Sequence, residues 1–399
     1  MKNQKKFSKN CFVAVLDVGT TGIKAFVFDG QCQVKAKAYK KIKKVRPRKG
    51  WVEQDPSEIL RVSRFVLRRA IKDSNVEPKK ILGIGITNQR EATVVWNSKT
   101  GRPVYPVIGW EDDRTRAFCA KLKKKHGRFI RERTGLTADA YFSASKIRWI
   151  LQNVSGKDLV FGTLDSWLIW NLCEDHPHVT DETNASRTLL FDIHKRKWSR
   201  ELCELFDVPK NILPRVLSSR AKFGKMKKEV LGFGCWVLAV CGDQQASAYA
   251  AIRSQPVSRS NITKVTYGTG VFVVQMIKKF ILHKNFFTTL VPDRKGISFA
   301  LEGKIEKSGE KVTSFLSSPA KLRACLLSLA KDVDRLIKKL PIRPKELVVD
   351  GGITRDGIVT LIQQEVSDIP VFQQTNYDGT ALGTAILVWD SIDKNIKKV

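Results

Sequence analysis

Hydrophobic and polar positions near the start of the chain predict three strands followed by a helix. Residues 11–17 form an apolar run, residues 19–22 a glycine turn, and residues 25–29 a second apolar run. Residues 33–40 alternate between apolar and mostly basic side chains, which predicts a third strand with lysines on its outer face. Asp-Pro-Ser-Glu at residues 55–58 combines an N-cap, a proline at the first helical position and a capping-box acid, so a helix to about residue 71 is predicted.

Later segments repeat these signals. Leucine and valine recur at helical spacing from residue 322 to residue 340, which predicts a long amphipathic helix. Because strands first follow one another directly and then alternate with helices, the pattern predicts an α/β fold. Further predicted helices lie at residues 143–154, 163–172, 356–366 (with Asp356 as N-cap) and from 380 onward, and further strands at 81–87, 237–240, within a hairpin at 265–276, and at 347–349.

Three predicted strands end in similar motifs: Asp17-Val-Gly-Thr-Thr, Thr266-Tyr-Gly-Thr-Gly and Asp350-Gly-Gly. Their recurrence predicts two related halves, with domains at residues 1–247 and 248–399. Glycines with small hydroxyl residues after a strand let backbone N–H groups approach a phosphate. Each turn alone is equally compatible with an ordinary hairpin, but the three together favour a nucleotide. Neither a Walker P-loop nor a G-x-G-x-x-G dinucleotide motif is present.

Composition and charge narrow the class of protein. Hydrophobic residues make up 42% of the 399, enough for a large core, and no apolar run approaches the ~18 residues of a membrane span. The basic N-terminus leads into too short an apolar stretch for a signal peptide. Eight cysteines without a C-x-x-C pair favour reduced thiols, so we expect a cytoplasmic protein without a disulfide framework or zinc site.

The formal net charge of +32 raises an anionic partner as a possibility. Residues 35–49 hold nine basic residues and no acid, and residues 121–133 and 220–228 are also rich in basic residues. These lysines alternate along a predicted strand or coat helices, and no aromatic residues are interleaved as in a base-stacking platform. We therefore interpret them as a solvated surface whose edge-strand lysines discourage aggregation, and disfavour nucleic acid as a partner.

Several motifs of this sequence resemble those of a known family. Residues 17–24, Asp-Val-Gly-Thr-Thr-Gly-Ile-Lys, resemble the first phosphate motif of the FGGY carbohydrate kinases, in the actin/hexokinase/Hsp70 superfamily. The resemblance covers about residues 12–303 and 322–388. Further motifs resemble the glycerol kinases within that family and lie at residues 50–56, 85–91, 110–115, 141–143, 161–170, 183–188, 242–245 and 266–270.

The resemblance implies an α/β fold of two actin-like, ribonuclease H-like ATPase lobes with a nucleotide cleft between them. It implies a cytoplasmic enzyme that converts glycerol and ATP, with Mg²⁺, to sn-glycerol 3-phosphate and ADP. The implied glycerol pocket provides hydrogen-bonding groups for hydroxyls and rings for the carbon backbone. Its residues are Arg90, Glu91, Trp110, Tyr141, Asp243, Gln244 and Phe272. Taken singly, the aromatic residues are equally compatible with a core, and Arg90-Glu91 with a surface ion pair.

Roles in the reaction are also implied by the resemblance. Asp243 is the expected general base, and Asp17 is expected to hold Mg²⁺ through water. The implied nucleotide contacts are Thr20, Thr21 and Lys24 on the phosphates, Gly268 and Thr269 as the opposing clamp, and Gly309, Gly352 and Asp356 along the nucleotide.

The sequence departs from the family pattern on the nucleotide side. Between residues 303 and 322 it lacks the family's Gly-Leu-x-Ala-Pro-Tyr-Trp segment, so the second lobe is expected to be reduced. Apolar surface left uncovered by this loss could be covered in a homo-oligomer. The alternatives are a related polyol or sugar kinase, a pseudokinase that keeps the polyol pocket, and a basic nucleic-acid-binding module built on a kinase fold.

Overall fold

The computed structural model describes residues 10–254, 262–268, 270–305, 319–354, 356–374 and 378–396. Contacts divide this part of the chain into two compact units. The larger unit holds residues 10–243 and 384–396, and the smaller unit is Gln244–Gly383. The domain assignment to residues 1–247 and 248–399 stays a prediction.

A six-stranded sheet forms the centre of the larger unit, in the order β13-β14-β5-β1-β2-β3. Strands β1, β2 and β3 are antiparallel neighbours, which is the predicted meander, whereas β5 and β14 run parallel to β1. The strands are β1 (Phe12–Val18), β2 (Gly22–Asp29), β3 (Val34–Lys41), β5 (Ile81–Asn88), β13 (Gly224–Lys225) and β14 (Trp236–Gly242).

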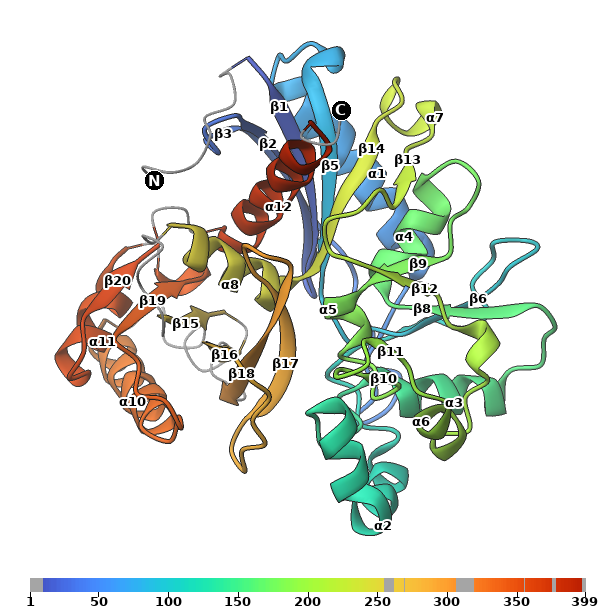
Figure 1. Ribbon diagram of the computed structural model, residues 1–399. Coiled ribbons are helices and arrows are strands. Elements are labelled where there is room, and N and C mark those ends of the chain that lie inside the picture. The colour runs from blue at the N-terminus through green and yellow to red at the C-terminus, as the bar shows by residue number, and fades with distance from the viewer. Residues whose placement is uncertain are drawn as a thin grey trace. The chain divides into compact units, whose positions relative to one another are not determined.

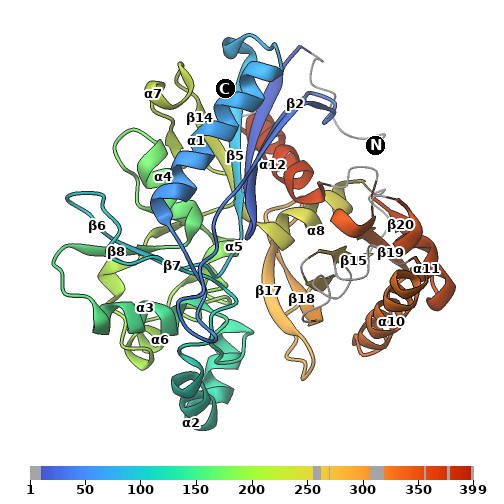
Figure 2. The same cartoon turned by 180° about the vertical axis from the view of Figure 1, so that it is seen from behind.

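Helix α1 (Pro56–Asp73) begins as the sequence predicts, because the Asp55 carboxylate accepts a hydrogen bond from the Ser57 N–H at 2.8 Å. The predicted reciprocal capping box does not form as such: the Glu58 carboxylate accepts from the Lys43 N–H at 3.0 Å. Figures 1 and 2 show α1 on one face of the sheet and α12 (Gly379–Ile396) on the other.

Smaller elements complete the larger unit. Four two-stranded sheets pair β4 (Glu53–Gln54) with β7 (Val107–Ile108), β6 (Val94–Asn97) with β8 (Leu159–Gly162), β9 (Val179–Asp181) with β12 (Arg215–Leu217), and β10 (Phe191–Asp192) with β11 (Lys197–Trp198). The helices are α2 (Arg116–Thr134), α3 (Ser143–Asn153), α4 (Leu164–Leu172), α5 (Glu182–Ala185), α6 (Arg200–Leu205) and α7 (Lys228–Leu231).

The smaller unit repeats the strand pattern of the larger one, in the order β17-β18-β16-β15-β19-β20. Strand β15 pairs antiparallel with β16 and parallel with β19, just as β1 pairs antiparallel with β2 and parallel with β5. Five strands of each sheet therefore share one topology, as two related halves would, and the sixth strand (β13 or β17) extends the opposite edge in each sheet. The strands are β15 (Ile262–Tyr267), β16 (Val271–Ile277), β17 (Phe287–Pro292), β18 (Ile297–Ile305), β19 (Glu346–Asp350) and β20 (Val371–Gln373).

Helices cover both faces of this second sheet. Helices α10 (Pro319–Ile337) and α11 (Ile358–Val366) pack on the face that carries Val271 and Val273, and α8 (Asp243–Ser254) packs on the face that carries Val274. The predicted Asp356 cap of α11 is wrong. The N-cap is Gly357, whose φ of +76° suits glycine, so Asp356 lies one residue too early to cap the helix.

No disulfide joins the eight cysteines, all of which lie within the described ranges. Among the described helices, none is both long and apolar enough to cross a membrane.

Candidate active site

The first phosphate motif lies where β1 ends and turns into β2. Asp17, only 9% exposed, pairs in register with Lys24, whose Nζ lies 3.9 Å from Asp17 Oδ2. The Gly19 N–H donates to the Gly22 carbonyl at 3.1 Å and closes the turn that carries Thr20 and Thr21. The four residues predicted here, Asp17, Thr20, Thr21 and Lys24, therefore lie together at one end of the sheet.

Hydrogen bonds join this turn to the predicted substrate pocket. Trp110 Nε1 donates to Thr20 Oγ1 at 3.0 Å. Gln54 Nε2 donates to the Thr20 carbonyl at 2.9 Å and accepts, through Oε1, from Gln89 Nε2 at 2.7 Å. Gln54 and Gln89 are buried, so the network fixes Trp110 against the phosphate turn. Sequence analysis gave Gln54 no role, although it lies in a recognised motif.

Four charged side chains alternate in sign around Arg90. Its Nε lies 3.3 Å from Asp243 Oδ1 and 3.6 Å from Glu91 Oε1, and Arg187 Nε donates to the same Glu91 oxygen at 2.6 Å. Arg90 and Glu91 are 2% and 1% exposed, which excludes the surface ion pair that the sequence left open. Buried charges are tolerated only when paired, so the alternation of signs is what allows this group to exist.

Aromatic rings lie beside these charges. The rings of Trp110 and Tyr141 meet edge to face with centroids 5.7 Å apart, and the Arg187 guanidinium lies 5.6 Å from the Tyr141 ring. Lys146 Nζ donates to the carbonyls of Tyr141 (2.9 Å) and Glu91 (3.3 Å). Burial lowers the pKa of Lys146 to about 8, partly offset by Glu91. The site thus combines hydrogen-bonding groups with half-buried rings, as a polyol requires.

A hydrogen-bonded network holds the strand end that carries Asp243. The Gly242 N–H donates to Thr183 Oγ1 at 2.8 Å, and Thr183 Oγ1 donates to Asp181 Oδ2 at 2.7 Å. Ser219 Oγ donates to the same Asp181 oxygen at 2.6 Å. Asp243 follows directly, with its side chain 29% exposed and able to reach a ligand. Asp181 was not predicted from the sequence, and Thr183 was recognised only as part of the motif at residues 183–188, without a role.

A second group of predicted residues lies in the smaller unit, around the β15–β16 turn. Gly268 N–H donates to the Gly270 carbonyl at 3.2 Å, and Thr266 Oγ1 donates to Gln244 Oε1 at 3.1 Å. Thr266 pairs in register with Phe272, which is 8% exposed. Gln244, Phe272 and Gly268 therefore lie near the same strand end, their roles in the substrate pocket and the phosphate clamp stay predictions, and Thr269 lies outside the described residues.

The third motif lies at the end of β19. Lys264 Nζ lies 2.6 Å from Asp350 Oδ1, and both side chains are almost fully buried. Ser247 also donates to the Asp350 carboxylate. A Cβ on the exposed Gly352 would meet no atom within 4 Å, so the backbone after Asp350 is open to a ligand. Sequence analysis missed Lys264.

Two further residues, Asp356 and Gly309, are predicted to contact the nucleotide. Asp356 is exposed and Gly309 lies outside the described residues. For Mg²⁺, no cluster of three or more His, Cys, Asp or Glu side chains occurs in the part of the chain that the structure describes. The single carboxylate of Asp17 at a phosphate turn still fits Mg²⁺, which usually keeps water and phosphate oxygens as its other ligands.

Comparison with known proteins identifies relatives over most of the chain. A family model described as the N-terminal domain of the FGGY family of carbohydrate kinases matches residues 12–250. Glycerol kinase 2 of Thermotoga maritima is 41% identical over 341 residues, covering 83% of this chain and 67% of that protein. A glycerol kinase of Clostridium botulinum is 35% identical over 445 residues, covering 94% of this chain and 89% of that protein. Because 445 exceeds the 399 residues of the chain, this relative has internal segments that the chain lacks.

Solved structures give the same result for the fold. A Plasmodium falciparum glycerol kinase with ADP has a TM-score of 0.86 at 25% identity, covering 96% of this chain and 90% of that one. A ligand-bound xylulose kinase from Lactobacillus acidophilus has a TM-score of 0.82 at 16% identity, with the same coverage, and at that identity supports the fold alone.

Proposed function

This chain belongs to the FGGY family of carbohydrate kinases, and from that premise we propose that it transfers the γ-phosphoryl group of Mg-ATP to glycerol, giving sn-glycerol 3-phosphate and ADP. Membership of the family makes the chain a phosphotransferase. Glycerol as the acceptor is supported by relatives that are named glycerol kinases at 35–43% identity. ATP is supported by the ADP in the similar Plasmodium falciparum glycerol kinase.

The observation that carries the proposal is the row of alternating charges that ends at Asp243. The Arg90 guanidinium, 3.3 Å from Asp243 Oδ1, orients that carboxylate. Arg90 also pairs with Glu91, and Glu91 is in turn held by Arg187. Asp243 Oδ accepts the proton of the attacking hydroxyl while the hydroxyl oxygen attacks the γ-phosphorus in line. The carboxylate therefore needs a fixed position, which the pairing with Arg90 provides.

The substrate is recognised by a mixture of polar groups and rings. Arg90, Glu91 and Gln244 provide donors and acceptors for the hydroxyls of glycerol. The rings of Trp110, Tyr141 and Phe272 cover its carbon backbone. Trp110 also donates to Thr20, which couples the substrate pocket to the phosphate turn.

For the nucleotide, we propose that Asp17 holds Mg²⁺ through water. When bound, Mg²⁺ neutralises charge on the phosphate oxygens. Backbone N–H groups of the glycine turns and the Lys24 ammonium bind phosphate oxygens. The nucleotide contacts are Thr20, Thr21, Lys24, Gly268, Thr269, Gly309, Gly352 and Asp356. A cytoplasmic location and a homo-oligomer stay predictions, and light scattering that gives the mass of a monomer would contradict the latter.

The test is Mg²⁺-dependent ADP release with and without glycerol. We expect glycerol-dependent release in the parent and a loss of about 10²–10⁴-fold in Asp243→Asn, because that variant cannot accept the proton. Glycerol binding, measured by calorimetry, should remain. A matched control is Asp207→Asn, whose carboxylate is 75% exposed and 3.9 Å from Arg148, and which should keep full activity.

Other outcomes point to the alternatives. Release that depends on another polyol or sugar but not on glycerol overturns the substrate assignment. If the protein binds glycerol but releases no nucleoside diphosphate with any Mg-nucleotide, the proposed reaction is overturned and the pseudokinase alternative is supported. Equal activity of the parent and Asp243→Asn overturns the role of Asp243 as general base.

A further inference from the structure

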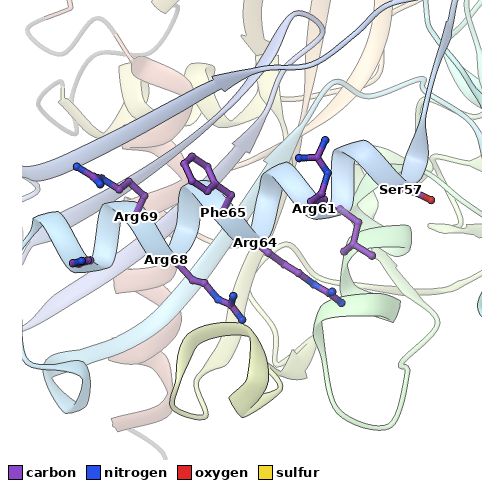
Figure 3. A pocket seen from close by; sticks show the side chains of 8 residues that line it. Ser57, Arg61, Arg64, Phe65, Arg68 and Arg69 are labelled. Atoms are coloured by element: carbon purple, nitrogen blue, oxygen red, sulfur yellow. The ribbon is translucent and has the colours of Figure 1, made fainter.

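A basic groove lies on the outer face of α1, and none of its residues belongs to the candidate active site (Figure 3). Its volume is about 500 Å³, and five of its eight lining residues are arginine or lysine, while none is acidic. The eight residues are Ser57, Leu60, Arg61, Arg64, Phe65, Arg68, Arg69 and Lys72. The basic runs noted in the sequence do not include this segment, so the groove is a feature that only the structure shows. We call it the α1 groove.

Helical spacing arranges these side chains in two rows. Arg64, Arg68 and Lys72 follow one another at intervals of four residues, and so do Arg61, Phe65 and Arg69. Four residues of an α-helix rise about 6 Å, so cations recur regularly along the groove. Figure 3 shows Arg64 and Arg68 pointing to one side of the helix, and Phe65 and Arg69 to the other.

Neutral backbone groups hold the two arginines of the first row in place, and Arg68 Nη2 also donates to the Glu229 carbonyl. Arg64 Nη2 lies 3.5 Å from the Asn171 carbonyl, and Arg68 Nε donates to the Val230 carbonyl at 2.6 Å. Carbonyl oxygens orient a guanidinium but leave its charge uncompensated. No ion pair to Arg64, Arg68 or Lys72 occurs within the described residues. The guanidinium groups of Arg64 and Arg68 are therefore positioned in advance for an anion, and the exposed Lys72 extends the row.

The second row adds an aromatic ring between two weakly paired arginines. Arg61 lies 4.0 Å from Glu58 and Arg69 lies 2.7 Å from Asp73, and both arginine side chains are mostly exposed, so these pairs contribute little. Phe65 is 48% exposed, and Lys40 Nζ of β3 lies 4.6 Å from its ring centroid. The groove thus combines guanidinium groups, which bind phosphate in a bidentate manner, with a ring on which a base can stack.

We propose that the α1 groove binds single-stranded nucleic acid, with phosphates along the row of Arg64, Arg68 and Lys72 and a base against Phe65. A regular row of cations matches a polymer that carries one phosphate per residue. Arg64 is half-buried, so a flat bilayer surface meets this cation less well than a flexible strand that can reach between the side chains of α1. A groove along one helix also fits one strand better than a duplex.

The experiment measures binding of a fluorescent 20-residue oligouridylate to the full chain by anisotropy, from 50 to 200 mM NaCl. With about three phosphates neutralised, one for each cation of the row, the slope of log K against log[salt] should be about −2, which weakens binding roughly 20-fold over this range. The double variant Arg64→Gln/Lys72→Gln should reduce the magnitude of the slope by about 1.4, since each lost phosphate contact removes ~0.7. Phe65→Ala should weaken binding roughly tenfold, within the range for loss of one stacked base.

The matched control is Lys121→Gln/Lys125→Gln on α2, which removes the same charge from two exposed lysines. Its slope and affinity should equal those of the parent. The proposal is overturned if the parent does not bind at 50 mM salt, or if the control loses as much affinity as the α1 variant. It is also overturned by tighter binding to a duplex of equal length, or to phosphatidylserine vesicles, than to the strand. Kinase activity should be unchanged in both double variants, so this test is independent of the proposed reaction.

Discussion

Buried charges such as Arg90, Glu91 and Lys264 pair with charges of opposite sign, whereas Asp165 and Asp181 are two neighbouring buried acids. Both carboxyls are fully buried in the larger unit. Thr163 and Thr180 donate to Asp165 at 2.5 and 2.6 Å, and no arginine or lysine pairs with it in the described structure. Burial, and then the negative charge of Asp181, raise the pKa of Asp165 to about 7. Asp165 is therefore expected to be protonated in the folded state at mildly acidic pH.

This shift predicts a loss of stability as the pH rises. The usual pKa of 3.8 applies to the unfolded chain, so between pH 3.8 and about 7 the folded state holds a proton that the unfolded state has released. Asp165 therefore stabilises the fold fully below about pH 4, and that contribution is lost as the pH rises to about 7, on the order of 4 kcal/mol. Asp165→Asn does not titrate, so its free energy of unfolding should fall less from pH 5 to pH 8 than that of the parent.

Urea unfolding at pH 5, 6, 7 and 8 measures this difference. Histidines titrate in the same range, and burial lowers the pKa of His178, but they are common to both proteins and cancel in the comparison. Asp207→Asn changes an exposed aspartate and should follow the parent at every pH. Parallel curves for the parent and Asp165→Asn would show that the Asp165 carboxyl titrates normally in the fold.

At the scale of elements, helices α8 and α12 approach so closely that glycine is required between them. A Cβ on Gly383 would lie 1.8 Å from the Ala246 carbonyl oxygen and 2.6 Å from its carbon. Both atoms are backbone, so relief requires one helix to move. Glycine to alanine inside a helix normally stabilises by about 0.5–1 kcal/mol. Gly383→Ala should instead destabilise by about 1–3 kcal/mol or more, because the added methyl overpacks the contact.

Gly127 in α2 is the matched control for this prediction. A Cβ there would meet only the Lys123 side chain, at 3.7 Å, which is ordinary contact. Gly127→Ala should therefore raise the free energy of unfolding by about 0.5–1 kcal/mol. Denaturant midpoints of the two variants should thus shift in opposite directions. A stabilising Gly383→Ala would contradict the close packing of the two helices.

The elements themselves were largely predictable, because each depends on local signals. The Asp55-Pro56 pair places the start of α1, and the alternation before it places β3. The cap of α11 was mispredicted, because the sequence offers both Asp356 and Gly357 and only the backbone φ of +76° decides between them. Pairing of β14 with β5 brings together residues far apart in the chain, and no local pattern contains that information.

Residues of the candidate site could be predicted from the sequence only where they lie within a recognised motif. Asp17, Arg90 and Asp243 each lie in a short motif at the end of a strand or shortly after it. The supporting residues Arg187 and Lys264 contact their partners across 96 and 86 positions of sequence, which spacing alone cannot reveal. The role of a buried charge depends on its partner, so the roles of Arg187 and Lys264 could be assigned only from the folded structure.

At the scale of the whole molecule, charge is the dominant feature. The chain has 71 lysine and arginine residues against 39 aspartate and glutamate residues. Even if every acid paired with one base, 32 cations would remain, and the α1 groove and the exposed lysines of α2 are two places where they gather. Repulsion among such charges destabilises the compact state, since unfolding separates them.

Screening this repulsion should stabilise the protein, so we expect the melting temperature to rise from 20 to 500 mM NaCl. Salt also weakens surface ion pairs, but exposed pairs contribute only about 0–1 kcal/mol each and are outnumbered by the excess cations. Each kcal/mol of screened repulsion corresponds to a rise of about 2–4 °C, or less in a chain of this size. Chloride is the suitable anion for this test, because sulfate would also strengthen apolar burial.

The variant Lys121→Gln/Lys125→Gln should have a higher melting temperature than the parent at 20 mM NaCl, and its melting temperature should respond less to salt. A melting temperature that falls with NaCl would mean that ion pairs, not repulsion, dominate the surface.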